Sequence, residues 1–311
     1  MPTALVTGAA GFIGSTLVDA LLDRGYTVNG LDSFATGRRT NLESALTDDR
    51  FTLYEGDIRN PEVVLTATEG VDVVFHQAAV ASVAESVENP ARTTDVNCTG
   101  TATVVDAARS AGVDRLVVAS SSAVYGSGGE LPKRESMPLR SESPYALSKE
   151  YTEQLARQAS ELYDLDSVAL RYFNVFGPRQ DPQGEYAAVI PKFAELLLDG
   201  SRPVVFGDGE QSRDCVYVDD VVRANLLAAE ADGSGDVFNV ARGERLTINE
   251  LVETLNRVLG TELAPRHDDP RPGDIRHSGA DISNARERLG FEPAVDFEAG
   301  LRRTIGYYDD R

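Results

Sequence analysis

Short apolar runs alternate with amphipathic stretches through the first half of the chain. The runs are apolar at nearly every position, which is typical of parallel strands buried on both faces of a sheet. We expect such strands at 3–7, 26–31, 51–55, 71–75, 115–120 and 165–170. Apolar positions at helical spacing between them predict helices at 12–24, 90–111 and 145–163. This alternation predicts an α/β protein with a doubly wound parallel sheet.

The pattern changes after residue 174, where short strands, helices and arginine-bearing loops follow one another. Thr247 and Glu250 are three residues apart at the start of one predicted helix, which is the spacing of a capping box. Helices are expected at 188–198, 248–259 and 282–289, with short strands at 203–206 and 237–240. We interpret this part of the chain as a smaller lobe that grips a substrate.

Composition narrows the classes of partner. The 311 residues include 30 Lys and Arg against 50 Asp and Glu, which gives a net charge of −20. A surface of that sign disfavours binding to nucleic acid or to an anionic membrane. The acidic residues are spread along the whole chain, and Lys occurs only at positions 133, 149 and 192. We therefore hypothesise a surface adapted to high salt.

The cysteines and the apolar runs bear on the compartment. Cys98 and Cys215 lie far apart and give neither a metal-ligand spacing nor a disulfide framework, so a reducing cytoplasm is expected. The chain enters a predicted strand directly, so we expect no signal peptide. No apolar run approaches the roughly 20 residues of a membrane span.

Three glycines separate the first predicted strand from the first helix. In that setting Gly8 permits a tight turn, Gly11 lets the backbone approach a pyrophosphate, and Gly14 lets the helix pack closely on the strand. The pyrophosphate would lie at the positive helix N-terminus, at Phe12 and Ile13. The alternative is a plain tight turn.

The ends of the second and fourth strands also fit a dinucleotide. Asp32 ends the second strand, where an acid accepts hydrogen bonds from ribose hydroxyls and repels a 2′-phosphate. This favours NAD, although Arg38 and Arg39 could hold such a phosphate, which leaves NADP open. Ala78 and Ala79 follow the fourth strand and are small enough for a dinucleotide to lie against the backbone.

A tyrosine and a lysine lie four residues apart at the start of the helix expected at 145–163. That spacing places Tyr145 and Lys149 on one helix face. A neighbouring ammonium favours phenolate over phenol, so Tyr145 could shuttle a proton near neutral pH. The serine run 120–122 ends the fifth strand, at the sheet edge where ligands bind in this architecture. The alternatives are a solvated helix face and a polar turn.

Together these residues resemble the extended short-chain dehydrogenase/reductase superfamily, in its NAD-dependent nucleotide-sugar epimerase/dehydratase branch, closest to the UDP-glucose 4-epimerases. The motifs that carry the resemblance span nearly the whole chain. They are Gly8-x-x-Gly11-x-x-Gly14, Asp32, Gly56-Asp57-Ile58, Asn97, the serines before Val124-Tyr125-Gly126, Tyr145-x-x-x-Lys149, Arg171-Tyr-Phe-Asn174, Arg213-Asp214 and Arg271-Pro-Gly-Asp274.

The resemblance implies two interleaved domains and a set of site residues. A Rossmann domain (1–174 plus about 212–242) would bind NAD, and a smaller α/β domain (about 175–211 plus 243–311) would bind a nucleotide sugar. Tyr145 would be the base, Lys149 its partner and a ligand of the nicotinamide ribose, and Ser121 the catalytic hydroxyl. Further implied cofactor contacts are Asp57, Ile58, Ala78, Ala79 and Asn97. Implied substrate contacts are Asn174, Arg213, Arg271, Asp274 and Ser278.

The resemblance also implies a reaction. Tyr145 would take the proton of the sugar 4-hydroxyl while NAD takes the hydride, and the 4-keto sugar would then receive hydride on its other face. Related 4,6-dehydratases carry Asp-Glu after the catalytic Thr, and related decarboxylases usually carry a Glu. Ser122 and Ala123 occupy those positions here, which favours a 4-epimerase. A dehydratase, a decarboxylase, a 4-reductase or net dehydrogenase, and a non-catalytic NAD(P) sensor are the alternatives.

Two finer expectations rest on the resemblance alone. A small residue at Ser278 would leave room for an N-acetyl group, so UDP-N-acetylglucosamine and UDP-N-acetylgalactosamine join UDP-glucose and UDP-galactose as expected substrates. The helices near 92–110 and 145–163 would form a homodimer through a four-helix bundle.

Overall fold

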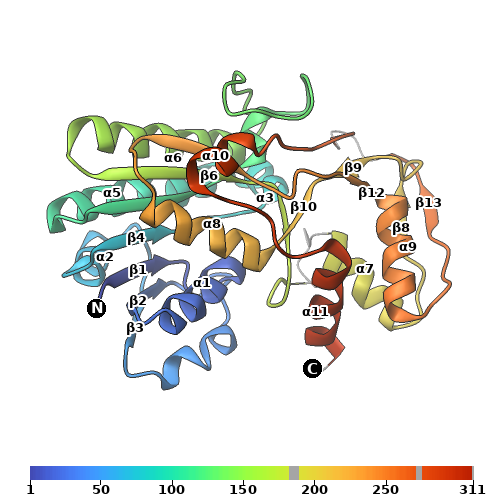
Figure 1. Ribbon diagram of the computed structural model, residues 1–311, viewed down its shortest axis with the longest axis horizontal. Coiled ribbons are helices and arrows are strands. Elements are labelled where there is room, and N and C mark those ends of the chain that lie inside the picture. The colour runs from blue at the N-terminus through green and yellow to red at the C-terminus, as the bar shows by residue number, and fades with distance from the viewer. Residues whose placement is uncertain (182–188, 271–274, 310–311) are drawn as a thin grey trace.

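A parallel sheet of seven strands is the frame of the larger lobe (Figure 1). The computed structural model describes residues 1–181, 189–270 and 275–309. The strand order is β11-β6-β5-β4-β1-β2-β3, with parallel pairing throughout. The strands are β1 (Thr3–Thr7), β2 (Thr27–Asp32), β3 (Phe51–Glu55), β4 (Val73–His76), β5 (Arg115–Ser121), β6 (Asp166–Tyr172) and β11 (Asp236–Val240). The predicted doubly wound Rossmann class is confirmed.

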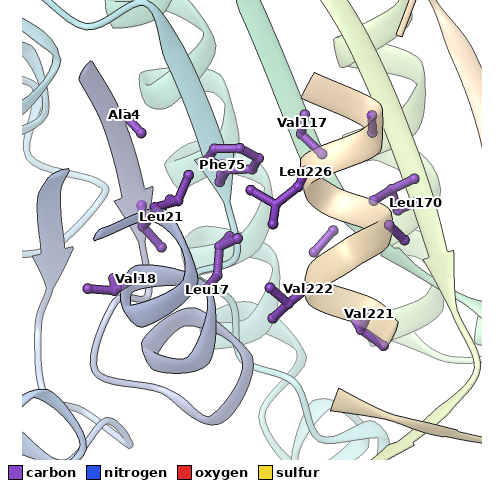
Figure 2. Packing of buried hydrophobic residues seen from close by; sticks show 14 of the residues in the cluster. Ala4, Leu17, Val18, Leu21, Phe75, Val117, Leu170, Val221, Val222 and Leu226 are labelled. Carbon is purple, nitrogen blue, oxygen red and sulfur yellow. The ribbon is translucent and has the colours of Figure 1, made fainter. Parts of the chain in front are cut away.

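Helices cover both faces of this sheet. α1 (Phe12–Asp23) and α8 (Val218–Glu230) lie on one face, where Leu17 and Leu226 pack near Phe75 of the sheet (Figure 2). α2 (Pro61–Thr68), α5 (Gly100–Ala111) and α6 (Pro144–Leu162) cover the other face. Along β1, Val6 is buried in the first cluster and Leu5 in the second, as the two-residue period of a strand requires.

The smaller lobe is built from short paired strands and three helices. Its helices α7 (Val189–Leu198), α9 (Ile248–Leu259) and α11 (Phe297–Asp309) enclose a separate apolar core that includes Phe176 and Leu251. The strand pairs are β7 (Asn174–Phe176) with β10 (Cys215–Tyr217), β9 (Ser212–Arg213) with β12 (Leu246–Thr247), and β8 (Val204–Phe206) with β13 (Arg266–Asp268). The capping box of Thr247 and Glu250 forms at the start of α9 as predicted.

The structure departs from the sequence expectations in three places. The helix predicted at 90–111 is divided into α4 (Pro90–Thr94), a π-helical turn (Asp95–Thr99) and α5. α3 (Val83–Glu88) was not predicted. α10 (Ser283–Leu289) packs on the large sheet through Ala285 and Leu289, although the predicted division assigned 243–311 to the smaller domain. The division into domains otherwise stays a prediction.

Single 3₁₀ turns at Arg39–Leu42, Ala45–Thr47 and Ser122–Tyr125 complete the described secondary structure. Among the helices of the described residues, none is long and apolar enough to cross a membrane.

Candidate active site

The glycine turn after β1 requires glycine at two of its three positions. Gly8 has φ of +69°, and a Cβ there would lie 2.8 Å from the Ala78 nitrogen. A Cβ on Gly14 would lie 2.0 Å from the Gly8 carbonyl oxygen, so only glycine lets α1 approach the turn this closely. α1 begins at Phe12 with Gly11 as its N-cap, without a capping side chain and without an acid in its first turn. The positive end of the helix is therefore open to an anion.

Asp32 braces this turn from the end of β2. Its carboxylate accepts hydrogen bonds from the Ala10 and Phe34 amides at 2.8 and 2.7 Å. Burial raises its pKa, and these backbone hydrogen bonds oppose the rise. The two nearby arginines are held in ion pairs: Arg38 with Asp181 at 2.8 Å, and Arg39 with Glu55.

The residues predicted to contact the cofactor after β3 and β4 also make contacts within the protein. The Asp57 carboxylate is hydrogen-bonded by the Arg59 guanidinium at 2.6 and 2.9 Å, which lowers the pKa of Asp57. Ile58 is buried, and a Cβ on Gly100 would lie 2.4 Å from its side chain. Ala78 donates its amide to the Thr7 hydroxyl at 3.2 Å, while Ala79 is half-buried beside it.

Asn97 lies in the π-helical turn and ties two elements together. Its side-chain oxygen accepts from the Val80 amide at 2.8 Å. Its side-chain nitrogen donates to the Val80 carbonyl at 3.1 Å and to the Ser148 hydroxyl at 2.9 Å. Asn97 thus holds the loop after β4 against α6, and the predicted direct contact with a cofactor stays a prediction.

Tyr145, Lys149 and Ser121 meet where α6 crosses the carboxyl end of β5. Ser143 caps α6, accepting the Ala146 amide at 3.1 Å, which places Tyr145 in the first turn. The Ser121 side chain lies beside the Tyr145 phenol and favours its ionised form. The Lys149 ammonium donates to the Ala119 carbonyl at 2.9 Å and lies 6.0 Å from the centroid of the Tyr145 ring.

Burial dominates the electrostatics of this pair. It raises the pKa of Tyr145, which the Ser121 side chain opposes. It lowers the pKa of Lys149 to about 8, which the Glu153 carboxylate opposes. The predicted lowering of the Tyr145 pKa by Lys149 is therefore not found in the protein itself, where burial is the largest influence on the phenol. The arrangement can still move a proton between a bound hydroxyl and Tyr145, since hydroxyl and ammonium donors surround that side chain.

The predicted substrate residues lie further along the same sheet edge. A cavity of about 210 Å³ is lined by Asn174, Arg213 and Cys215 together with apolar side chains of β7, α7 and α9. Asn174 follows two residues after Tyr172, which is the register partner of Ser121. The chain thus runs from the end of β6, beside Ser121, directly into β7, which lines the cavity.

Ser278 lies next to the strand of Arg213. Its amide donates to the Ser212 carbonyl at 2.9 Å, and Arg213 donates to the same carbonyl at 3.0 Å. Arg271 and Asp274 lie outside the described residues.

Sequence reasoning gave no role to Asp214, which is fully buried beside Arg213. Its carboxylate accepts from the Arg242, Gly243 and Ala280 amides at 2.9 to 3.2 Å. Burial raises its pKa to about 6. The available signal was an acidic residue directly before the apolar run Cys215–Tyr217. The amides that it accepts from are distant in sequence, so the sequence alone does not identify them.

Comparison with known proteins agrees with this geometry. The model of the NAD dependent epimerase/dehydratase family matches residues 4–241. The UDP-glucose 4-epimerase of Mycolicibacterium smegmatis is 43% identical, covering 99% of this chain and 98% of the relative.

Two solved structures are similar along their whole length. A UDP-N-acetylglucosamine 4-epimerase from Methanobrevibacter ruminantium, in complex with UDP-N-acetylmuramic acid, has 42% identity and a TM-score of 0.96, covering 99% of this chain and 98% of that one. A UDP-glucose 4-epimerase from Thermotoga maritima with UDP-glucose has 40% identity and a TM-score of 0.94, covering 99% of both chains. The matched family model and these identities show that the chain belongs to the NAD dependent epimerase/dehydratase family.

Proposed function

We propose that this protein interconverts nucleotide sugars at C4, with NAD as a transient hydride acceptor. The observation that carries the proposal is that Tyr145, Ser121 and Lys149 converge at one point, with the Lys149 ammonium held by the Ala119 carbonyl 6.0 Å from the centroid of the Tyr145 ring. This group lies at the carboxyl edge of a parallel sheet that also carries the glycine turn, which is where doubly wound folds bind their ligands. Membership of the family and the names of its close relatives support the same reaction.

The residues around the glycine turn fit NAD. The pyrophosphate would lie on the uncapped N-terminus of α1, and Asp32 would accept the adenosine ribose hydroxyls. Arg38 and Arg39 are already paired with carboxylates, which supports NAD over NADP. When bound, NAD supplies the acceptor for the C4 hydride.

The chain's own residues would handle the proton. Tyr145 accepts the proton of the sugar 4-hydroxyl, and Ser121 hydrogen-bonds the same oxygen and keeps it oriented. The Lys149 ammonium stabilises the phenolate that Tyr145 needs as a base. Burial of Tyr145 and Lys149, with Ser121 half-buried beside them, limits the access of water to the 4-keto sugar until Tyr145 returns the proton.

The nucleotide end of the substrate would occupy the cavity beside Asn174 and Arg213. A guanidinium binds phosphate oxygens in a bidentate manner, which suits Arg213 to the diphosphate. We infer UDP-glucose and UDP-galactose as substrates, and their N-acetylated forms as well because Ser278 is small. Ser122 and Ala123 form a 3₁₀ turn at the place where a dehydratase would need acids, which disfavours that alternative.

A panel of nucleotide sugars tests the reaction. The purified protein would be incubated with NAD and, separately, UDP-glucose, UDP-galactose, their N-acetylated forms, UDP-glucuronate and dTDP-glucose, and the products separated by chromatography. Interconversion of 4-epimers without accumulating NADH supports the proposal. A 4-keto-6-deoxy product, or NADH in stoichiometric amounts, would replace it with a dehydratase or a dehydrogenase.

The Tyr145→Phe variant assigns the base within the same assay. It removes only the phenolic oxygen, so NAD binding should persist while turnover falls at least about 10²-fold, the low end of general-base contributions. Turnover at the wild-type rate would show that another group is the base.

We also propose a homodimer in which α6 packs against its copy. Leu147, Tyr151 and Leu162 are 61%, 40% and 65% exposed along α6, and Val83 and Val87 on α3 are 47% and 63% exposed. Apolar residues gathered on neighbouring helices are typical of an interface. Light scattering should give twice the chain mass, and Leu147→Glu should give a monomer. A monomeric wild type at micromolar concentration would refute the dimer.

The compartment and the salt requirement complete the proposal. Cys98 and Cys215 are both free thiols, which supports a reducing cytoplasm. The net charge of −20 supports adaptation to high salt.

A further inference from the structure

Three consecutive residues at the end of β5 meet three side chains that follow each other by one turn along α6. Ser121 lies beside Tyr145, the Ala119 carbonyl accepts from Lys149, and the Ser120 hydroxyl donates to Glu153. Tyr145, Lys149 and Glu153 are at i, i+4 and i+8, on one face of the helix. The third contact belongs to the same array as the two in the proposed site, but Glu153 has no part in the reaction described above.

Glu153 is a buried carboxylate with a buried cation. Glu153 and Arg171 are 3% and 4% exposed. The Arg171 guanidinium binds both carboxylate oxygens, through Nε at 2.8 Å and Nη2 at 2.7 Å. Arg171 lies on β6 directly opposite Ser120 in the parallel ladder. Both strands therefore hold the Glu153 carboxylate in place on α6.

The other charged and titratable groups near this array can be named element by element. On β4, His76 is buried and neutral, because burial first and Lys149 second lower its pKa to about 3. On the far side of Arg171, the Tyr125 hydroxyl accepts a hydrogen bond from it at 2.8 Å. The Glu135 carboxylate accepts from the Asn239 amide at 2.8 Å.

The balance of buried charges around Glu153 indicates its role. This face of α6 and the neighbouring strand β6 carry two cationic side chains, Lys149 and Arg171, and one carboxylate, Glu153. With the carboxylate in place, Arg171 is neutralised and Lys149 remains as the cation beside Tyr145. Without it, Arg171 would be buried without a counter-charge, and Lys149 would lose the neighbouring anion that favours its protonated form.

We propose that Glu153 is a positioning residue for proton transfer, which holds α6 in register on β5 and, as the carboxylate one helical turn away, keeps Lys149 charged beside Tyr145. This inference deepens the proposed epimerase function and rests on it. Glu153 touches neither the sugar nor the cofactor in this scheme. Its charge acts on Lys149 from one helical turn away and on Tyr145 from two turns away.

The effect of removing the charge can be sized. Residues at i and i+4 are about 6 Å apart, and at an effective dielectric constant of about 20 one unit charge at that distance shifts a pKa by about one to two units. Glu153→Gln should therefore move both limbs of the bell-shaped dependence of kcat on pH about one to two pH units toward acid. The KM for the nucleotide sugar should change less than about twofold, because the substituted side chain remains far from the sugar.

The experiment measures kcat and KM against pH for the NAD-loaded wild type, Glu153→Gln and Glu161→Gln. Glu161 lies two turns further along α6 on the surface, paired with Arg157, and its variant should keep the wild-type profile. If Glu153→Gln lowers kcat equally at every pH, with both limbs unmoved, its role is only structural and the proposal is wrong.

A second variant covers the case in which Glu153→Gln does not fold, since it leaves Arg171 buried without a counter-charge. Glu153→Gln combined with Arg171→Met buries neither charge. Because Glu153 is the charge that acts on Lys149, the limbs should still move toward acid, by about half a pH unit or more. Limbs at the wild-type positions would overturn the proposal.

A spectroscopic titration separates this inference from the proposed function. The chain has 11 Tyr and no Trp, so its near-ultraviolet absorbance at high pH reports tyrosinate without interference from indole. The difference between each protein and its Tyr145→Phe counterpart gives the pKa of Tyr145 without any turnover. If the wild type acts on no sugar, the proposed function fails. An acid shift of the Tyr145 pKa in Glu153→Gln would still support the positioning role, and an unshifted pKa would refute it.

Discussion

The glycine turn gives the sharpest prediction, because the structure sets a scale for each substitution. Gly14→Ala places a Cβ 2.0 Å from the Gly8 carbonyl oxygen and 2.8 Å from the Gly8 carbonyl carbon. Both are backbone atoms, so the overlap cannot be relieved by rotating a side chain. To restore ordinary contact, α1 must retreat from the turn by about an ångström, and strain of this kind costs about 1–3 kcal/mol of stability.

The same retreat should weaken NAD binding. The pyrophosphate is expected on the N-terminus of α1, and hydrogen bonds there act over a narrow range of distance. We expect the free energy of unfolding to fall by about 1–3 kcal/mol and NAD affinity to fall about 10-fold or more, equivalent to about 1.4 kcal/mol. Urea denaturation and isothermal titration calorimetry measure the two quantities on the same sample.

Two further Gly→Ala variants serve as controls. A Cβ on Gly11 would lie 3.2 Å from the Gly8 carbonyl oxygen, so Gly11→Ala should cost little stability yet still hinder the pyrophosphate. Gly306 lies inside α11 with nothing within 4 Å of a Cβ, so Gly306→Ala should stabilise by about 0.5–1 kcal/mol and leave NAD affinity unchanged. The reasoning is refuted if Gly14→Ala has the same free energy of unfolding and the same NAD affinity as the wild type.

Three other predictions concern Asp214, the capping box and salt. Asp214→Asn should lower stability at pH 7 by about 1–3 kcal/mol, because an amide cannot accept all three backbone donors. Since the folded pKa of Asp214 is raised to about 6, above its unfolded value, its ionisation reduces stability as pH rises from about 4 to about 6. Urea unfolding at several pH values should show that this decrease is weaker in the variant, and identical pH profiles would contradict it. Thr247→Ala should cost about 1 kcal/mol by removing the N-cap of α9, as measured by urea unfolding, and no change would mean that the box contributes nothing. The thermal midpoint should rise as KCl is raised from dilute buffer to molar concentration, because salt screens the repulsion among carboxylates, and a constant midpoint would refute the adaptation to salt.

The larger lobe could be predicted from the sequence because its strands are buried on both faces. A continuous apolar run such as 115–120 carries its signal locally, and β5 is found at Arg115–Ser121. The pair Tyr145 and Lys149 was accessible for the same reason, since i and i+4 meet on any helix. The smaller lobe could be predicted less well, because strands of two or three residues such as β9 and β12 are too short to show a periodic pattern of apolar residues.

The contacts that could not be predicted join residues distant in sequence. The helical pattern of 90–111 has no signal for the π-helical turn that aims Asn97 at Val80. Glu153 has the right spacing after Lys149, but its partner Arg171 is found only once the register of β5 and β6 is known. The pKa of Tyr145 likewise depends on burial, which a spacing of four residues does not reveal.

The chain passes repeatedly between the two lobes: after β6, between β10 and α8, between β11 and β12, between β13 and α10, and finally between α10 and α11. Neither lobe is therefore a continuous segment that could be exchanged as a cassette or expressed alone with its core intact. New sugar specificity has to arise by point replacement in the loops of the smaller lobe. Transplanting that lobe from a relative would require several simultaneous junctions, one of which, after β6, lies within two residues of Asn174.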